Sequence, residues 1–150
     1  MPPAGEEEQT LLLLLLRARG GYGNTIAAHL AAGGFDDLPR NGRFVLSGMD
    51  RHGGSAVELI RSLGVSRQAA SQLIDTLVLR GYLRREVNPG DRRRMNIVLT
   101  ERGRAAAAAI QGGSDEVDAR LAQLLSPAEL AGLRAGLAAL AEIKEETADD

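Results

Sequence analysis

The sequence predicts a mainly α-helical chain that carries one small β-hairpin. Leucine and alanine recur at helical spacing toward both ends of the 150 residues. Two alternating segments, 83–87 and 95–99, flank the turn residues Asn88-Pro89-Gly90-Asp91, a pattern typical of a hairpin. Two short helical patterns joined by a glycine-containing turn come directly before it. Together these observations predict a winged helix-turn-helix core over 37–103, flanked by N- and C-terminal dimerisation helices.

Composition narrows the class of protein. At 44% hydrophobic and 25% charged residues, the chain has the make-up of one ordinary globular domain. It contains no cysteine, which excludes disulfides, thiolate metal sites and a thiol redox switch. Residues 1–8 form an acidic tail, the reverse of a secretory leader, and the leucine run 11–16 is far shorter than a membrane span. We therefore expect a cytoplasmic protein with no membrane partner.

The N-terminal dimerisation segment, 9–35, has apolar residues spaced for a helix, but Gly20, Gly21 and Gly23 interrupt it. Each glycine in a helix interior costs about 1 kcal/mol relative to alanine, so a break or kink near 20–24 is expected. Pro39 suits the first turn of a second helix that reaches roughly to Arg51. The residues expected to supply the buried side of that helix are Phe44, Val45, Leu46 and Met49.

The helix-turn-helix is marked by its caps. Ser55 followed by Glu58 is a capping box that starts a helix over about 56–63, Gly64 suits its left-handed end, and Ser66 can cap the next helix. In that second, recognition helix, Ala70, Leu73, Ile74 and Leu77 face the core. The residues left to face the major groove of DNA are Ser66, Arg67, Gln68, Ser71 and Gln72. Gln68 can pair with adenine and Arg67 with guanine or phosphate, whereas for Gln72 a plain solvent-facing role is equally open.

The charge of the chain is strongly segregated. Ten arginines and four acidic residues give segment 61–104 a net charge of +6, which leaves −8 for the rest of a chain whose total is −2. Three of those arginines, Arg92, Arg93 and Arg94, follow Asp91 beside the hairpin turn. A local positive field on a thin projecting element is the footprint of a DNA-binding lobe.

Three segments carry a resemblance to a known family: Tyr82-Leu83, then Asn88-Pro89-x-Asp91-Arg92-Arg93, then Val98-Leu99-Thr100-x-x-Gly103. In this order and spacing the chain resembles the MarR family of bacterial winged-helix regulators. The resemblance implies a homodimer that binds pseudo-palindromic double-stranded DNA and is released by a small molecule or by oxidation. It also implies that the Asp91 carboxylate fixes Arg93 for insertion into the minor groove, while Arg92 and Arg94 meet phosphates.

The C-terminal segment, 104–147, is predicted to form the second set of dimerisation helices. Thr100 can cap a helix through the alanine run 105–109, and Gly112-Gly113 is expected to interrupt it. Ser126-Pro127-Ala128-Glu129 combines a capping box with a proline at the first helical position. The final helix has a short heptad seam, which either packs on its own domain or wraps a second copy. We predict an obligate dimer that uses Leu12, Leu15, Leu130, Leu133, Leu137 and Leu140.

Neither catalysis nor a cofactor is expected. His29 and His52 are the only histidines, and neither has the spacing of a metal or nucleophile site, so no catalytic residue, metal or cofactor is assigned. The family resemblance implies a cleft for a small anionic or aromatic effector. Its candidates, by location only, are Arg17, Tyr22, His29, Arg43 and Met49. For each of these, a structural or solvated role is the commoner alternative.

The function expected is sequence-specific transcriptional regulation, most simply by repression, and not an enzyme activity. The alternative is a winged-helix module that binds a protein partner or acts as an architectural nucleic-acid-binding module without a specific operator. Sharp preference for one duplex sequence separates the two.

Overall fold

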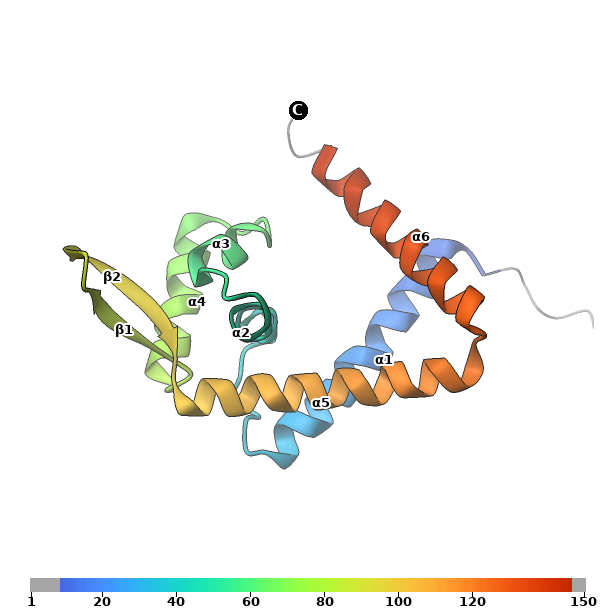
Figure 1. The fold of residues 1–150 in the computed structure, drawn as a ribbon, viewed down its shortest axis with the longest axis horizontal. Coiled ribbons are helices and arrows are strands. Elements are labelled where there is room, and N and C mark those ends of the chain that lie inside the picture. The colour runs from blue at the N-terminus through green and yellow to red at the C-terminus, as the bar shows by residue number, and fades with distance from the viewer. Residues whose placement is uncertain (1–8, 147–150) are drawn as a thin grey trace, which may run out of the picture. The chain divides into compact units, whose positions relative to one another are not determined.

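The computed structural model describes residues 9–146, so the predicted acidic tail 1–8 lies outside the described residues. The chain divides into two compact units, residues 1–114 and 115–150. The elements in order are α1 Leu11–Ala32, α2 Arg40–His52, α3 Ala56–Arg61, α4 Arg67–Leu79, β1 Leu83–Asn88, β2 Asp91–Leu99, α5 Glu101–Leu124 and α6 Pro127–Glu146. The strands form one antiparallel hairpin (Figure 1). The predicted fold, mainly helical with a winged helix-turn-helix, is confirmed.

The first unit has one apolar core. Its buried side chains come from the end of α1, from α2 to α4, from the base of the hairpin and from the first half of α5: Leu30, Leu38, Val45, Leu46, Ala56, Ile60, Ile74, Leu77, Tyr82, Leu83, Leu99, Ala106, Ala107 and Ile110. The prediction that Phe44 is buried is wrong, since its side chain is 45% exposed. Each residue turns the helix by about 100°, and Val45 and Leu46 occupy the inward face.

Helix α1 is continuous, and the predicted break near residues 20–24 is wrong. Thr10 caps its start by accepting a hydrogen bond from the Leu13 amide at 3.3 Å, and Leu30 anchors its end in the core. Leucine and alanine, both strong helix formers, occupy the turns on either side of the glycines. The three glycines lower the stability of the helix. The capped start and the buried Leu30 at its end nevertheless keep α1 continuous across them.

Helix α5 is also continuous, which corrects the interruption expected at Gly112-Gly113. A Cβ atom added to Gly113 would lie 2.8 Å from Ile26 Cα, and one added to Gly112 would lie 3.1 Å from His29 Nδ1. Because a side chain at Gly113 would meet the α1 backbone, this glycine lets α1 and α5 approach closely inside the first unit. Close packing, rather than a break in the helix, explains Gly113.

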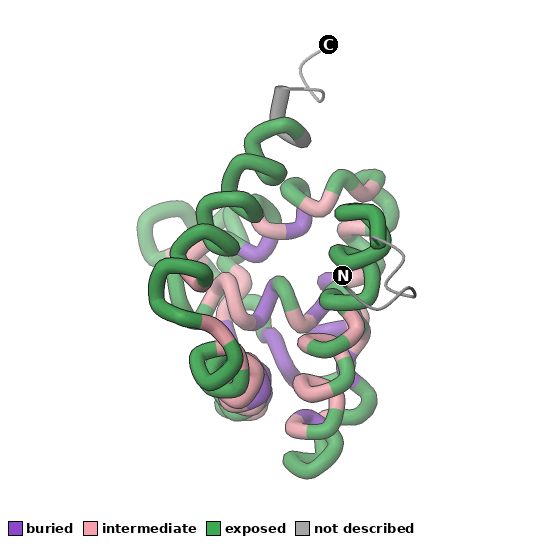
Figure 2. Tube along the Cα trace, turned by 90° about the vertical axis from the view of Figure 1, so that its right-hand side faces the viewer, coloured by how far each residue is buried: buried purple, intermediate pink, exposed green. Residues whose placement is uncertain are grey.

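The second unit contains the end of α5 and all of α6. The predicted capping box is confirmed: the Ser126 amide donates to Glu129 Oε2 at 2.7 Å, and the Glu129 amide donates to Ser126 Oγ at 3.3 Å. The hydrogen bond from the Ser126 amide, together with one from the Ser126 side chain, stabilises the charged carboxylate and lowers the pKa of Glu129. Along 127–143, where burial is described, α6 has no fully buried residue, and its tube is coloured as exposed over most of its length (Figure 2).

Candidate nucleic-acid interface

Both serine caps of the helix-turn-helix form as predicted, but the capping box of Ser55 and Glu58 forms only in part, because among the described residues the Glu58 side chain makes no hydrogen bond to the Ser55 amide. Ser55 Oγ accepts from the Glu58 amide at 3.5 Å to begin α3, which ends at Arg61, two residues before the predicted end. Gly64 has a φ of 68° in the turn, a left-handed conformation that favours glycine. Ser66 Oγ then accepts from the Ala69 amide at 3.1 Å to begin α4. The turn thus fixes where the recognition helix starts.

The recognition helix α4 separates core residues from polar ones. Ile74 and Leu77 are buried, while Ala70 and Leu73 pack partly against the core. The five predicted DNA-facing residues are all exposed: Ser66, Arg67, Gln68, Ser71 and Gln72. They belong to the cap and the first two turns, the part of such a helix that reaches base edges.

The hairpin carries an irregularity at the three consecutive arginines. Its register pairs Leu83 with Leu99 and Val87 with Met95, but Asn88 pairs with Asp91. Residues 92–94 therefore have no cross-strand partners and are extra residues on β2, a bulge larger than the usual single residue. Bulges bend a strand and re-aim its side chains. The structure thus places all three arginines where the strand departs from regular pairing.

The carboxylate of Asp91 contacts the backbone of Arg93. Asp91 Oδ1 accepts from the Arg93 amide at 3.0 Å, whereas the family resemblance implied a contact with the guanidinium. Asp91 therefore shapes the bulge rather than holding the arginine head. Among the described residues, the side chains of Arg67, Arg92, Arg93 and Arg94 make no hydrogen bond or ion pair. Their guanidinium groups remain available to an anionic partner.

Two ion pairs in this region escape sequence reasoning. Asp75 Oδ1 on α4 lies 2.5 Å from Arg85 Nη2 on β1, and Arg84 pairs with Glu86 within β1. The first pair links the recognition helix to the hairpin. Both pairs are partly exposed, and such pairs contribute little stability. Only the fold brings α4 and β1 into contact, so the sequence offers no local signal for the Asp75–Arg85 pair.

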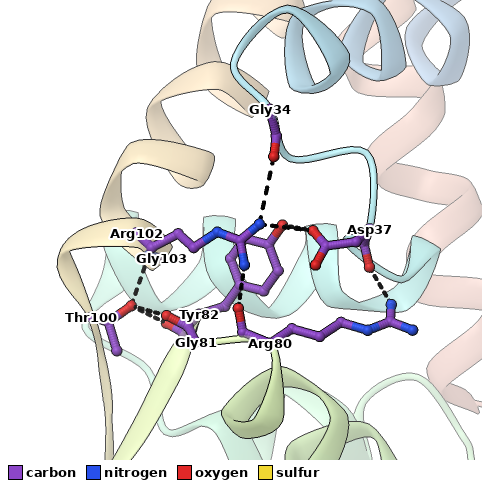
Figure 3. Close-up of polar contacts among 8 residues, drawn as sticks. All are labelled: Gly34, Asp37, Arg80, Gly81, Tyr82, Thr100, Arg102 and Gly103. Atoms are coloured by element: carbon purple, nitrogen blue, oxygen red, sulfur yellow. Dashed lines mark hydrogen bonds and ion pairs between the residues drawn. The ribbon is translucent and has the colours of Figure 1, made fainter.

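A second polar cluster surrounds the junction between α4 and β1 (Figure 3). Asp37 Oδ1 accepts from the Tyr82 hydroxyl and from Arg102 Nη2, the latter at 3.0 Å. The hydrogen bond from Tyr82 is the main reason that the pKa of Asp37 is lowered, with the Arg102 charge adding to it. Burial, together with the hydrogen bond to Asp37, raises the pKa of Tyr82 to about 12.

A pocket of about 520 Å³ lies between α1 and α2 in the first unit. Its lining residues are Leu16, Arg19, Gly20, Tyr22, Gly23, Asn24, Ile26, Ala27, Arg40 and Arg43. The lining contains three arginines and no acidic residue. Arg43 Nη1 donates to the Gly23 carbonyl at 3.3 Å, while its buried Nε has no partner. A Cβ atom added at Gly20 or Gly23 would meet nothing within 4 Å, so these glycines leave the pocket wall open.

The structure brings together only two of the five predicted effector residues. Tyr22 and Arg43 line the pocket. Met49 packs partly against the core, Arg17 donates to Gln9 Oε1 at 2.8 Å, and His29 lies beside Gly112. Sequence reasoning missed Arg19 and Arg40, although both lie within three residues of a predicted candidate.

The predicted dimerisation leucines are largely solvent-exposed in this single chain. Leu12 and Leu15 on α1 and Leu133, Leu137 and Leu140 on α6 are each between 38% and 66% exposed, and Leu130 is partly buried. Within residues 9–146 no helix is long and apolar enough to cross a membrane. Over the same residues, no group of three or more histidine, aspartate or glutamate side chains is placed to hold a metal ion.

Comparison with known proteins gives a consistent picture. A family model described as MarR family matches residues 37–94. The uncharacterized protein Rv2011c of Mycobacterium tuberculosis is 38% identical over 77 residues, which are 51% of this chain and 54% of that protein. An uncharacterized protein of Mycobacterium bovis, Mb2034c, matches equally. The alignment therefore spans about half the length of these curated relatives.

Solved structures match over most of the chain. The transcriptional repressor CouR, bound to a 23-mer DNA duplex, is 27% identical, with 94% of this chain and 99% of that chain covered and a TM-score of 0.68. MepR of S. aureus in complex with DNA is 22% identical, with 90% and 98% covered and a TM-score of 0.70. At that identity, the likeness to MepR shows the fold alone.

Proposed function

We propose that this chain is a transcriptional regulator that binds a specific double-stranded DNA operator, since a MarR family model matches residues 37–94. One observation carries the proposal. The start of α4 presents exposed polar groups, and Arg67 beside Ser66 and the three bulged arginines of β2 have side chains that make no hydrogen bond or ion pair among the described residues. Phosphate contacts supply affinity and base contacts supply sequence preference, and this surface offers both.

Within this proposal each residue has a role. Gln68 reads an adenine and Arg67 a guanine or a phosphate, while Ser66 and Ser71 meet phosphates. Gln72 stands at the edge of this surface. Arg93 enters a narrow minor groove, whose negative potential attracts a guanidinium, and Arg92 and Arg94 bind the flanking backbone.

The proposed assembly is a homodimer on a pseudo-palindromic site. The exposed leucines of α1 and α6 support it, since an apolar stripe of this kind is stabilised by burial against another surface. Two-fold symmetry presents two recognition helices one turn of DNA apart. Repression is the proposed direction of control, in line with the CouR repressor. The proposal carries with it a cytoplasmic location and no enzyme activity.

Replacement of Arg93 tests the proposed DNA contact. Arg93→Ala should weaken binding to a selected operator about tenfold and lower the salt slope of log K by about two, one for each protomer of the proposed dimer. Arg51→Ala, which removes an exposed arginine outside the proposed surface, is the matched control and should bind as wild type. Equal affinity and salt slope for Arg93→Ala and wild type would overturn the role of the bulged arginines.

The pocket between α1 and α2 supports the finer proposal of an anionic effector with an apolar body. Its three arginines and the unpartnered Arg43 Nε provide charge and a hydrogen-bond donor, and Leu16 and Ile26 provide apolar wall. Benzoate is a suitable probe. It should raise the melting temperature of the wild-type chain and leave that of Arg43→Gln unchanged. An equal rise in both proteins, or none in either, would contradict an effector site at Arg43.

A further inference from the structure

The junction between the recognition helix and the hairpin is only three residues long. Arg80, Gly81 and Tyr82 connect α4, which ends at Leu79, to β1, which begins at Leu83. Any rotation at this junction changes the angle between α4 and the bulged arginines. The angle between the two proposed DNA-contacting elements therefore depends on what holds residues 80–82.

The start of α5 holds one side of the junction. Thr100 Oγ1 donates a hydrogen bond shared between the Gly81 carbonyl, at 2.5 Å, and the Tyr82 carbonyl, at 3.1 Å. A Cβ atom added to Gly103 would lie 2.1 Å from the Tyr82 carbonyl oxygen. The backbone of α5 is thus packed directly against the junction, with no room for a side chain between them.

The turn between α1 and α2 holds the other side through one carboxylate. Asp37 accepts hydrogen bonds from the Tyr82 hydroxyl and from Arg102, and its backbone carbonyl accepts one from the Arg80 side chain. These partners lie 45, 65 and 43 residues away in sequence. Figure 3 shows the three side chains converging on Asp37.

Arg102 completes the cluster. Its guanidinium carbon lies 4.4 Å from the centre of the Tyr82 ring, and its Nη1 donates to the Arg80 carbonyl. The same side chain therefore contacts both ends of the junction and Asp37. A planar guanidinium stacked on a ring and held by a carboxylate is strongly restricted in orientation.

From this geometry we propose that Asp37 is a positioning residue for DNA reading, which holds the α4–β1 junction so that recognition helix and hairpin fit one operator half-site together. The inference rests on the proposed function. Asp37 itself does not touch DNA in this account. It acts through Tyr82 and Arg102.

If Asp37 only stabilised the fold, its removal would have a different effect on DNA binding. The side chain of Asp37 is 43% exposed, and an ion pair as exposed as this one adds little to stability. An acidic group in a lobe that binds an anion also weakens the binding of DNA by simple repulsion. Electrostatics alone therefore predicts that removal of Asp37 strengthens DNA binding, whereas the positioning role predicts that it weakens specific binding. The two accounts differ in sign.

Asp36 provides the matched control. It is the neighbouring exposed carboxylate, and among the described residues it makes no hydrogen bond or ion pair. The experiment measures the affinity of full-length wild type, Asp37→Ala and Asp36→Ala for a selected operator duplex and for a scrambled duplex of equal length. We expect Asp37→Ala to bind the operator about tenfold more weakly than wild type, a loss of the size typical for removal of a hydrogen bond to a charged group. The same variant should bind the scrambled duplex at least as well as wild type. Asp36→Ala should bind both duplexes as well as or better than wild type.

Equal behaviour of the two alanine variants would overturn the positioning role while leaving the proposed function intact. Failure of the proposed function is distinguishable, since wild type would then show no preference for any duplex.

Tyr82→Phe tests the same inference without a change in charge. It removes only the hydroxyl that donates to Asp37 and keeps the buried ring under Arg102. We expect a several-fold lower ratio of operator to scrambled affinity, with an unchanged salt slope because phosphate contacts are retained. An unchanged ratio would contradict the inference even if Asp37→Ala proved too unstable to study.

Discussion

The first unit, which contains the winged helix-turn-helix, and helix α6 differ in how far their leucine side chains are buried. In the first unit, Leu30, Leu46, Leu77 and Leu83 are almost fully buried in the same core as Tyr82. On α6, three seam leucines remain 38–45% exposed. The first unit has a core of its own, whereas the leucine stripe of α6 is stabilised only when something covers it. The proposed homodimer would explain this difference, because a second copy would cover the exposed leucines of α6.

The largest expected effect comes from charging the stripe. Leu133→Asp with Leu137→Asp should abolish the dimer, because two carboxylates would be buried in an apolar interface. Operator affinity should then fall about a hundredfold or more, since each monomer engages only one half-site. Sedimentation and operator titration measure both effects. Leu124→Asp, which charges an exposed leucine outside the seam, is the control. A dimer that persists in the double variant would contradict the proposal that the leucines of α6 form the dimer interface.

Within the first unit, substitution of Gly113 tests how closely α1 and α5 pack. Gly113→Ala should destabilise the protein by about 1–3 kcal/mol, because the new methyl group would meet the α1 backbone at Ile26. Gly21→Ala, whose Cβ meets nothing, should stabilise it by up to about 1 kcal/mol. Urea unfolding measures both free energies. The same sign for the two substitutions would contradict the close α1–α5 contact.

In the first unit, the buried Tyr82 makes stability depend on alkaline pH. The pKa of Tyr82 rises from 10.0 to about 12 on folding, so its contribution to stability is present below pH 10 and is lost as pH rises toward 12. Tyr82→Phe should remove this part of the alkaline loss. Thermal unfolding at several pH values between 9 and about 12 checks the difference. A wild-type slope in Tyr82→Phe would contradict the assignment.

The smallest effect is expected at the start of α6. The pKa of Glu129 is lowered by its hydrogen bonds to Ser126, so its contribution is present above its ordinary value of 4.5 and is lost as pH falls through the lowered value. Glu129→Gln should flatten this acid loss of helicity in far-ultraviolet circular dichroism. Identical acid profiles for wild type and Glu129→Gln would count against the charged cap.

Local signals predicted most of the fold. Ser55, Ser66 and Ser126 each cap the helix they were expected to cap, and the alternation of residues 83–87 and 95–99 predicted the hairpin. The failures are tertiary. The local cost of glycine predicted a break in the helix at Gly20 and at Gly113. Both helices continue, because α1 is anchored in the core and contacts α5 closely.

The candidate site divides in the same way. The exposed face of α4 follows from helical periodicity once Ile74 and Leu77 are placed in the core. The bulge at residues 92–94 does not, because alternation cannot reveal where strand pairing slips. The Asp37 cluster joins residues more than 40 positions apart, so no window of sequence contains it.

Operator-specific DNA binding by a dimer is best tested by selecting duplexes from a random pool with the 150-residue protein. The bound duplexes are sequenced after rounds at two salt concentrations. The account predicts one enriched inverted repeat whose half-site centres lie about one helical turn apart, bound more weakly at the higher salt. Salt-sensitive binding with no enriched motif would contradict it, and would favour an architectural or protein-interaction role for the same basic surface.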